Sequence, residues 1–308
     1  MSTTGSLSTT SRKKPTPLRP PRRLGRLDYI LIGLIALTIG WLYYRSSIGI
    51  NYQWNWANAI ELIFTPRANG DMPYFFQGLM YTLRLSIWGV IFSVVLGVIL
   101  GIARHANNAV FRMLATAYIQ LIRNIPPLVF VFIFYFFISN QLIPLLGMDQ
   151  VFRNPSTDHA TIWTILFGQA SLWENLFSGV FCVGLLSAAY IAEVLRAGLE
   201  GIEKGQWEAA DALGLSIWAK YRYVIAPQVI SAIAPPLAGQ AISLVKDSSI
   251  VALISIQELT FVGTEIANSS GLIFEIWLLV ALAYFGLCFS LSLLFSHFER
   301  TSRKHLTK

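Results

Sequence analysis

The chain has 308 residues, of which 55% are hydrophobic and only 13% are charged. Soluble domains carry roughly 25% charged residues, so this composition argues against a water-soluble enzyme and predicts a membrane-integral protein. The formal net charge is +7, and the basic side chains are unevenly placed along the sequence.

The first 26 residues are rich in Ser, Thr and Pro, and they contain basic side chains but no acidic one. One interpretation is a basic arm for nucleic acid. The composition is more typical of a disordered cytoplasmic tail whose positive charges orient the helix that follows, so no nucleic-acid partner is predicted. A secretory signal peptide fits poorly, because no small-residue cleavage site follows the apolar stretch. The basic residues are Arg12, Lys13, Lys14, Arg19, Arg22, Arg23 and Arg26.

Six apolar stretches approach the length of about 20 residues that a bilayer-crossing helix needs. The segment 51–63 contains two tryptophans and is predicted to lie at the outer membrane interface, where tryptophan is favoured. Residues 141–171 are predicted to form a polar loop, and residues 250–266 a shorter segment of mixed polarity. The predicted spans are 29–44, 75–103, 111–139 (interrupted at Pro126-Pro127), 174–199, 229–245 (broken at Pro235-Pro236) and 273–298.

Small residues recur along the second predicted span, and they allow another helix to pack closely against it. The two cysteines, Cys182 and Cys288, fall in apolar stretches, so neither a disulfide nor a metal site is predicted. The glycines of the second span are Gly78, Gly89, Gly97 and Gly101.

Six spans put both termini on one side of the membrane, and clustered basic residues mark that side as cytoplasmic. The opposite loops contain only Arg45, Arg67 and Arg153. An all-α membrane protein with both termini in the cytoplasm is therefore predicted. Its parts are a disordered basic tail at 1–26, an extra transmembrane helix with an extracytoplasmic amphipathic segment at 27–73, a transmembrane domain at 74–298 with a cytoplasmic loop at 200–227, and a basic tail at 299–308.

The cytoplasmic loop at 200–227 is longer and more patterned than a turn between spans requires. Residues 205–213 are predicted to form a short helix that ends at Gly214, because glycine accepts the left-handed conformation after a helix. The hydroxyl of Ser216 is predicted to cap a second helix that runs toward Pro227.

The composition of the short helix favours contact with another protein. Ala209 and Ala210 are predicted to leave one face smooth, and Glu208 and Asp211 place acidic groups beside it. A solvated helix-turn-helix would not require these small residues at these spacings. The loop therefore predicts a helix that inserts into a groove on a soluble partner.

The spacing of these residues resembles the EAA loop of bacterial ABC importer permeases. Val224 and Ala226 stand where that family often has Ile and Leu, which are mild departures. In the family, this loop is the coupling helix that docks into the ATP-binding subunit. The resemblance assigns this docking role to Gly205, Glu208, Ala209, Ala210, Leu213, Gly214 and Pro227.

Further motifs, all in order between about residue 75 and residue 298, resemble the polar amino-acid branch of these permeases, the histidine/glutamine type. The longer chain resembles the permeases of general and acidic amino-acid systems. Asn124 and Ile125 depart from the Gly-Thr of the family's R-G-T-P-L segment. The motifs are G-x-x-x-T-L-x-x-S at 78–86, R-N-I-P-P-L at 123–128, A-Y-x-x-E-x-x-R-A-G at 189–198, K-G-Q-x-E-A-A at 204–210, K-D-S-S at 246–249 and Q-E-L at 257–259.

The resemblance implies a type I importer core of five helices with one extra N-terminal helix, in a bacterial inner membrane. The sequence contains no G-x-x-x-x-G-K-[ST] phosphate loop, so ATP and magnesium are expected on a partner ATPase. No catalytic residue and no metal ligand are predicted. The other implied partners are a second permease subunit, with a heterodimer favoured over a homodimer, and an extracytoplasmic amino-acid-binding protein. Transport by alternating access is expected.

Ionisable residues within predicted spans are candidates for the substrate pathway, because such residues usually face the interior of a bundle. Tyr190 and Glu193 lie one turn apart, and Glu193 is expected either to hold a substrate ammonium group or to pair with Arg196. Lys246 and Asp247 are expected either to line the pathway or to neutralise one another.

Other polar and proline positions have two open interpretations each. Glu258 is a weaker pathway candidate. Arg123 is either a gate contact or structural. Pro126, Pro127, Pro235 and Pro236 are expected to interrupt helical hydrogen bonding near a cavity or gate.

Two alternative functions stay open at this point. The chain is an importer subunit for another polar solute, such as an opine or an osmolyte, or it is a membrane sensor that has the permease fold without transport. The main hypothesis remains an amino-acid permease.

Overall fold

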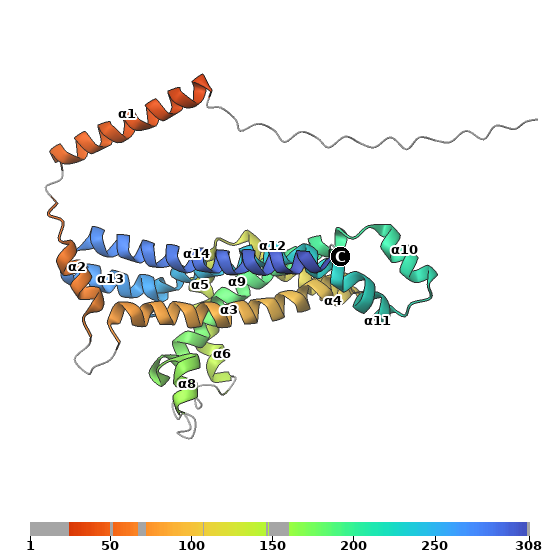
Figure 1. Ribbon diagram of the computed structural model, residues 1–308. Helices are drawn as coiled ribbons and strands as arrows, with labels where there is room; N and C mark the ends of the chain where they lie inside the picture. Colours follow the sequence, from red (N-terminus) through yellow and green to blue (C-terminus); the bar gives the residue numbers. More distant parts are fainter. Residues whose placement is uncertain are drawn as a thin grey trace, which may run out of the picture. The chain divides into compact units, whose positions relative to one another are not determined.

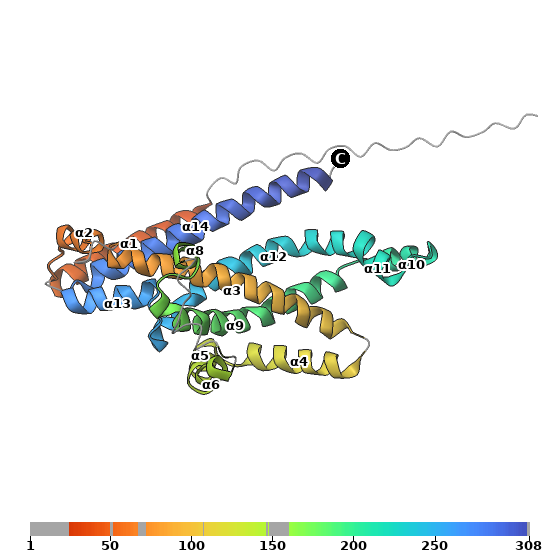
Figure 2. The same cartoon turned by 90° about the horizontal axis from the view of Figure 1, so that it is seen from below.

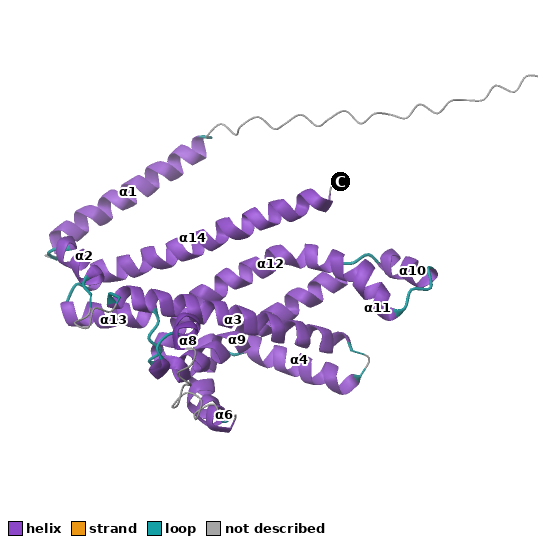
Figure 3. Ribbon diagram, turned by 60° about the horizontal axis from the view of Figure 1, so that its bottom comes forward, coloured by secondary structure: helices purple, strands orange, loops and turns teal. Residues whose placement is uncertain are grey.

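The computed structural model of the protein describes residues 25–49, 52–66, 72–106, 108–145, 147 and 160–306. The predicted N-terminal tail lies outside the described residues, except for its last two positions. Every regular element in the described ranges is a helix (Figure 3), which confirms the all-α class. The chain divides into two units, Met1–Gln53 and Trp54–Lys308.

The described helix of the first unit is α1 (Arg26–Gly49). Its segment Leu27–Arg45 is long and apolar enough to cross a membrane, and its side chains are not buried in the structure. The extra N-terminal helix predicted at 29–44 is therefore present.

The second unit is built on long helices that run side by side (Figures 1 and 2). The pair α3 and α9 makes the most extensive contact, and α12 packs against α9 and α14. These helices are α3 (Tyr74–His105), α4 (Ala109–Asn124), α9 (Trp173–Glu200), α12 (Ala226–Asp247) and α14 (Ile273–Leu306).

Glycines on α3 let α9 approach closely, as the sequence predicts. A Cβ atom on Gly97 would lie 2.6 Å from the Cγ2 atom of Ile191, and one on Gly101 would lie 2.6 Å from the Cδ2 atom of Leu195. Gly89 meets Val183 of α9 and Leu244 of α12 in the same way, at 3.2 Å. These glycines therefore set the close spacing of α3 and α9 through steric fit.

We expect Gly97→Ala to lower the unfolding temperature of the purified protein by several degrees, because the added methyl group overpacks the α3–α9 contact at a cost of about 1–3 kcal/mol. The matched control is Gly286→Ala in α14, where no described atom lies within 4 Å of the added Cβ position. Thermal unfolding in detergent measures both variants. Equal unfolding temperatures for the two variants would contradict the steric role of Gly97.

The third predicted span, 111–139, is bent rather than straight. The helix α4 ends at Asn124, and α5 (Pro127–Ile133) with the π-helix η1 (Phe134–Ser139) leaves it at an angle of 113°. Ile125 and Pro126 have extended backbones at the bend, because a residue before proline avoids the helical conformation. The predicted interruption at Pro126-Pro127 is confirmed.

The prediction of a polar loop at 141–171 is partly wrong, because the described part of this region contains helices. The helix α8 is apolar, and side chains of α3 bind its last carbonyl groups. Arg84 donates to the carbonyl of Ile165 at 3.0 Å, and the indole of Trp88 donates to that of Leu166 at 3.1 Å. Arg84 thus fastens this segment to the bundle. The elements are α6 (Asn140–Leu145), α8 (Ala160–Phe167) and η3 (Ala170–Leu172).

The predicted break at Pro235-Pro236 is wrong, because α12 continues through both prolines. Proline removes one backbone donor but keeps a helical φ angle, and the packing of α12 against α9 and α14 supports the helix there. The actual break comes after the 3₁₀ helix η5 (Ser248–Ile254), where Ser255 has a φ of +60°. The next helix, α13 (Leu259–Ser270), replaces the mixed segment predicted at 250–266.

The amphipathic segment predicted at 51–63 is the helix α2 (Trp56–Phe64), and it belongs to the second unit. Its buried residues Ala59 and Ile63 pack in one cluster with Phe75, Leu259 and Ile276. By its contacts, α2 groups with the second unit, which begins at Trp54.

The described helices include five that are long and apolar enough to cross a membrane, or six if the bent pair α4 and α5–η1 is one span. This agrees with the predicted number of about six. Within the second unit, α2 and α13 lie at one end of the bundle, and α10 (Lys204–Ala212) and α11 (Ile217–Ala219) lie at the other (Figures 1 and 2).

Candidate functional site

The predicted cytoplasmic loop forms the helix pair α10 and α11 at one end of the bundle. Gly214 has a φ of +67°, and its N–H donates to the carbonyl of Asp211, while Leu215 donates to that of Ala210. These two bonds are the Schellman motif that ends a helix at glycine. Ser216 caps α11 through a hydrogen bond from the N–H of Ala219 at 3.3 Å. Both predicted end signals are confirmed.

The sequence predicts that Ala209 and Ala210 share one exposed face of α10. In the structure they do not. Ala210 is only 2% exposed, and α10 packs against the π-helix η4 (Lys220–Ile225). Consecutive helical residues are about 100° apart, so when Ala210 points inward, Glu208 and Ala209 stay exposed. Ala210 is therefore a packing residue, and the exposed face carries Gly205, Glu208, Ala209 and Leu213.

Large apolar side chains extend this exposed face beyond α10. Leu213 is 76% exposed, and Ile217, Trp218 and Tyr223 are also exposed. Pro227, the last residue of the predicted motif, is the second residue of α12. An exposed apolar group of this kind is typical of a protein–protein contact.

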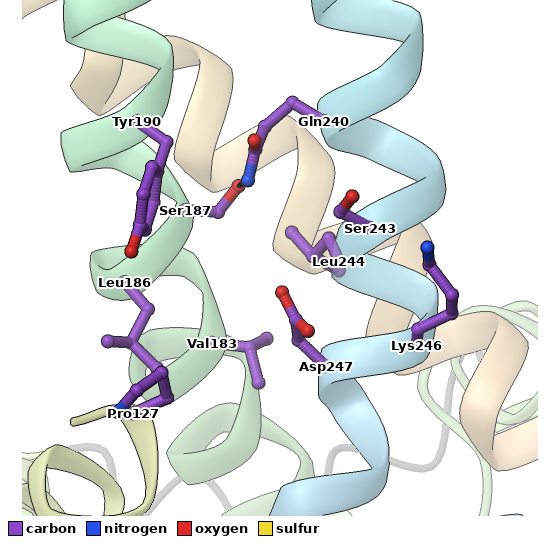
Figure 4. Close-up of a pocket in the computed structure, with 10 residues that line it drawn as sticks. All are labelled: Pro127, Val183, Leu186, Ser187, Tyr190, Gln240, Ser243, Leu244, Lys246 and Asp247. Carbon is purple, nitrogen blue, oxygen red and sulfur yellow. Dashed lines mark hydrogen bonds between the residues drawn. The ribbon is translucent and has the colours of Figure 1, made fainter. Parts of the chain in front are cut away.

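A cavity of about 310 Å³ lies between α9 and α12, beside the start of α5. Tyr190 and Ser187 enter it from α9, Gln240 and Asp247 enter it from α12, and Pro127 closes one side (Figure 4). The amide of Gln240 donates to the hydroxyl of Ser187 at 3.1 Å across the cavity. The remaining lining residues are Val183, Leu186, Ser243, Leu244 and Lys246.

Two charged candidates from the sequence, Lys246 and Asp247, line this cavity at the end of α12. The carboxylate of Asp247 points toward α9 in Figure 4, whereas Lys246 extends from the other side of the α12 backbone. Asp247 is thus the acidic group that faces Ser187 and Tyr190. The cavity can surround a small polar molecule with a carboxylate, hydroxyls, an amide and apolar walls, which is the mixed lining typical of ligand pockets.

Glu193 lies outside the cavity and binds arginines from three helices. Arg104 of α3 donates to its Oε2 atom at 2.6 Å, and Arg196 donates to its Oε1 atom at 2.5 Å. The guanidinium group of Arg123 of α4 lies 3.5 Å from its Oε2 atom. Arg196 also pairs with Glu200. The predicted pairing with Arg196 is present, and both carboxylate oxygens of Glu193 are occupied by arginine.

Glu258 does not line the cavity. Its side chain is fully buried and caps α13 by accepting from the N–H of Phe261 at 2.9 Å. It also accepts a hydrogen bond from the hydroxyl of Tyr284 of α14 and lies 3.5 Å from that of Thr82 of α3. Burial raises the pKa of the Glu258 carboxyl above its usual value. Its position indicates a role in joining α3, α13 and α14.

A family model for "Binding-protein-dependent transport system inner membrane component" matches residues 93–304, which is most of the chain. The chain is a member of this family. It is therefore a multi-pass transport permease subunit of the inner membrane. The exposed pair α10–α11 and the cavity between α9 and α12 both lie inside the matched range.

Similar permeases match nearly their whole length. The "Probable amino-acid ABC transporter permease protein YckA" of Bacillus subtilis (strain 168) is 34% identical over 79% of this chain and 91% of its own length. The "Glutamate/aspartate import permease protein GltK" of Escherichia coli O157:H7 is 28% identical over 81% and 98%. The "Probable glutamine ABC transporter permease protein GlnM" of Bacillus subtilis is 30% identical over 75% and 94%.

Two solved structures have a similar fold. One is "Crystal structure of an amino acid ABC transporter with histidines", with a TM-score of 0.63 and 28% identity over 81% of this permease and all of that chain. The other is "Crystal structure of a bacterial ABC transporter involved in the import of the acidic polysaccharide alginate", with a TM-score of 0.56 and 15% identity over 90% and 96%. The second likeness concerns the fold alone.

The uncharged polar residues of the cavity and one cation of the Glu193 group were not predicted from the sequence of this permease. Ser187, Gln240 and Ser243 lie on the same faces of α9 and α12 as Tyr190 and Asp247, and their helical spacing from these two predicted candidates was an available signal. Arg104, in contrast, is 89 residues from Glu193 in the sequence, so no local spacing points to their pairing. Of the residues predicted for the pathway, the structure brings Tyr190, Lys246 and Asp247 together.

Proposed function

We propose that this permease forms part of the transmembrane pathway of an ATP-binding-cassette importer for polar or acidic L-amino acids. The relatives and one similar solved structure are named for amino-acid transport, and two of the relatives are named for glutamate and aspartate or for glutamine. Under this proposal, the cavity between α9 and α12 is the passage site, and Asp247 binds the ammonium group of the substrate.

The observation that carries the proposal is the covalent connection between the exposed helix and the cavity. The helix α9 ends at Glu200 and α12 begins at Ala226, and α10 lies in the segment between them. The two helices that wall the cavity are therefore the two helices joined to α10. A movement imposed on α10 acts on both walls, which is what rigid-body switching between inward-open and outward-open states requires.

Three partners belong to this proposal. An ATPase subunit, which binds ATP and magnesium, receives α10 through Gly205, Glu208, Ala209 and Leu213. An extracytoplasmic binding protein delivers the amino acid to the opposite end. A second permease subunit completes the pathway, and Escherichia coli (strain CFT073) has both GltJ and GltK as relatives, so a heterodimer is favoured. Both termini then lie in the cytoplasm.

Competition uptake tests the substrate class. Cells that depend on this importer are given a radiolabelled L-amino acid, with unlabelled glutamate, aspartate, glutamine, histidine, an opine or glycine betaine in excess. We expect amino acids with polar or acidic side chains to compete, and the opine and the osmolyte to have little effect. If only the opine or only the osmolyte competed, that solute would replace polar amino acids as the proposed substrate class.

A further inference from the structure

Arg123 occupies a position between the Glu193 group and the cavity. Its guanidinium lies 3.5 Å from the carboxylate of Glu193 and 5.8 Å from the centre of the ring of Tyr190, which lines the cavity. Pro127, another lining residue, comes four positions later in the chain, across the α4–α5 bend. Arg123 therefore does not line the cavity itself but contacts Tyr190, a residue of α9 that does.

The ion pairs of Glu193 leave Arg123 as the most loosely held arginine of the group. Arg104 and Arg196 make hydrogen bonds of 2.5–2.8 Å with the two oxygens of Glu193, whereas Arg123 makes only the 3.5 Å contact. The side chain of Arg123 is 40% exposed, compared with 20% for Arg104 and 28% for Arg196. Glu193 would keep two arginine partners if Arg123 moved away.

The charges of the group favour binding of an additional carboxylate. Three guanidinium groups meet two carboxylates, those of Glu193 and Glu200, so one positive charge is in excess. Guanidinium groups bind carboxylates in a planar, two-pronged geometry. A ring of Tyr190 beneath Arg123 supports a cation at this place.

We propose that Arg123 is the residue that binds the α-carboxylate of the transported amino acid, by exchanging its contact with Glu193 for a contact with the substrate in the cavity. Asp247, on the facing helix, then holds the ammonium group, so the two ends of the zwitterion are bound from opposite walls. This inference rests on the proposed function. It makes Glu193 the resting partner of Arg123 and removes it from direct contact with the substrate.

The test uses the purified importer complex in nanodiscs, without binding protein. Binding of radiolabelled L-glutamine and L-glutamate is measured, and L-glutaminol, which has an alcohol in place of the α-carboxylate, competes with L-glutamine. We expect the wild type to prefer L-glutamine over L-glutaminol by roughly tenfold to hundredfold, as charge-assisted hydrogen bonds to a carboxylate imply. In Arg123→Gln this preference should fall to near unity, and in Arg123→Lys it should be intermediate.

Matched variants separate recognition from structural support. Arg104→Gln removes another arginine of the same group, and we expect it to keep the wild-type preference. Glu193→Gln releases Arg123 and should keep or increase the preference. The role of Arg123 would be overturned if Arg123→Gln kept the wild-type preference for L-glutamine over L-glutaminol. It would also be overturned if Lys246→Gln lost that preference instead. Either result would leave the proposed function intact. Failure of the wild type to bind any of the probes would overturn both.

Discussion

An importer that carries Glu208→Lys should assemble in the membrane but lose ATP-driven uptake by about tenfold or more. The change reverses the charge at the centre of the exposed α10 face, and like charges placed together across an interface cost several kcal/mol. Glu208 is exposed, and the Schellman motif and the packing of Ala210 fix α10, so the substitution should leave the helix in place. Uptake into vesicles and ATPase activity of the same preparation measure the coupling.

The matched control is Glu203→Lys, which makes the same change at the N-cap of the same helix. Residue 203 lies seven positions, or about two helical turns, before Ala210. It is therefore on the same side of the helix as Ala210, and this side faces away from Glu208. We expect near-normal uptake for this control. Equal uptake by both variants would remove Glu208 from the docking surface.

Asp247→Asn should lower amino-acid uptake by roughly tenfold to hundredfold, because it removes the acidic group that faces α9 across the cavity. The substitution nearly preserves side-chain volume, so the end of α12 should keep its structure. Binding of the ATPase subunit should be unchanged, since α10 is at the end of the bundle. Uptake rates are normalised to the amount of assembled complex.

Glu174→Gln in the first turn of α9 is a suitable control, because it removes a carboxylate outside the cavity lining. We expect it to transport at about the wild-type rate. Normal uptake by Asp247→Asn would exclude this carboxylate as the partner of the substrate ammonium group, and the passage site would then have to lie elsewhere.

Local signals in the sequence predicted the helices and the ends of α10 well. Gly214 and Ser216 act within a few residues of themselves, and apolar length alone marks α1, α3, α9 and α14. The branch of the family was also visible in short motifs. These features depend on neighbouring residues, and so they can be read from one sequence.

The errors concern features that depend on distant parts of the chain. Pro235 and Pro236 do not break α12, because tertiary packing against α9 and α14 outweighs the loss of two helical donors. Ala210 is buried because η4 lies against it. Glu193 and Glu258 were grouped as pathway candidates by charge alone, and only their partners separate them from Asp247. Arg104 and Thr82 are 89 and 176 residues away from these carboxylates.

Under the proposed function, the chain forms a transport pathway that is driven through α10 by a separate ATPase. The most direct measurement reconstitutes the permease, its ATPase and its binding protein in liposomes, and follows the accumulation of a radiolabelled amino acid. We predict accumulation against a gradient that requires both ATP and the binding protein. ATP hydrolysis that responds to the loaded binding protein, without any accumulation, would contradict a transport role and favour a sensor with the permease fold.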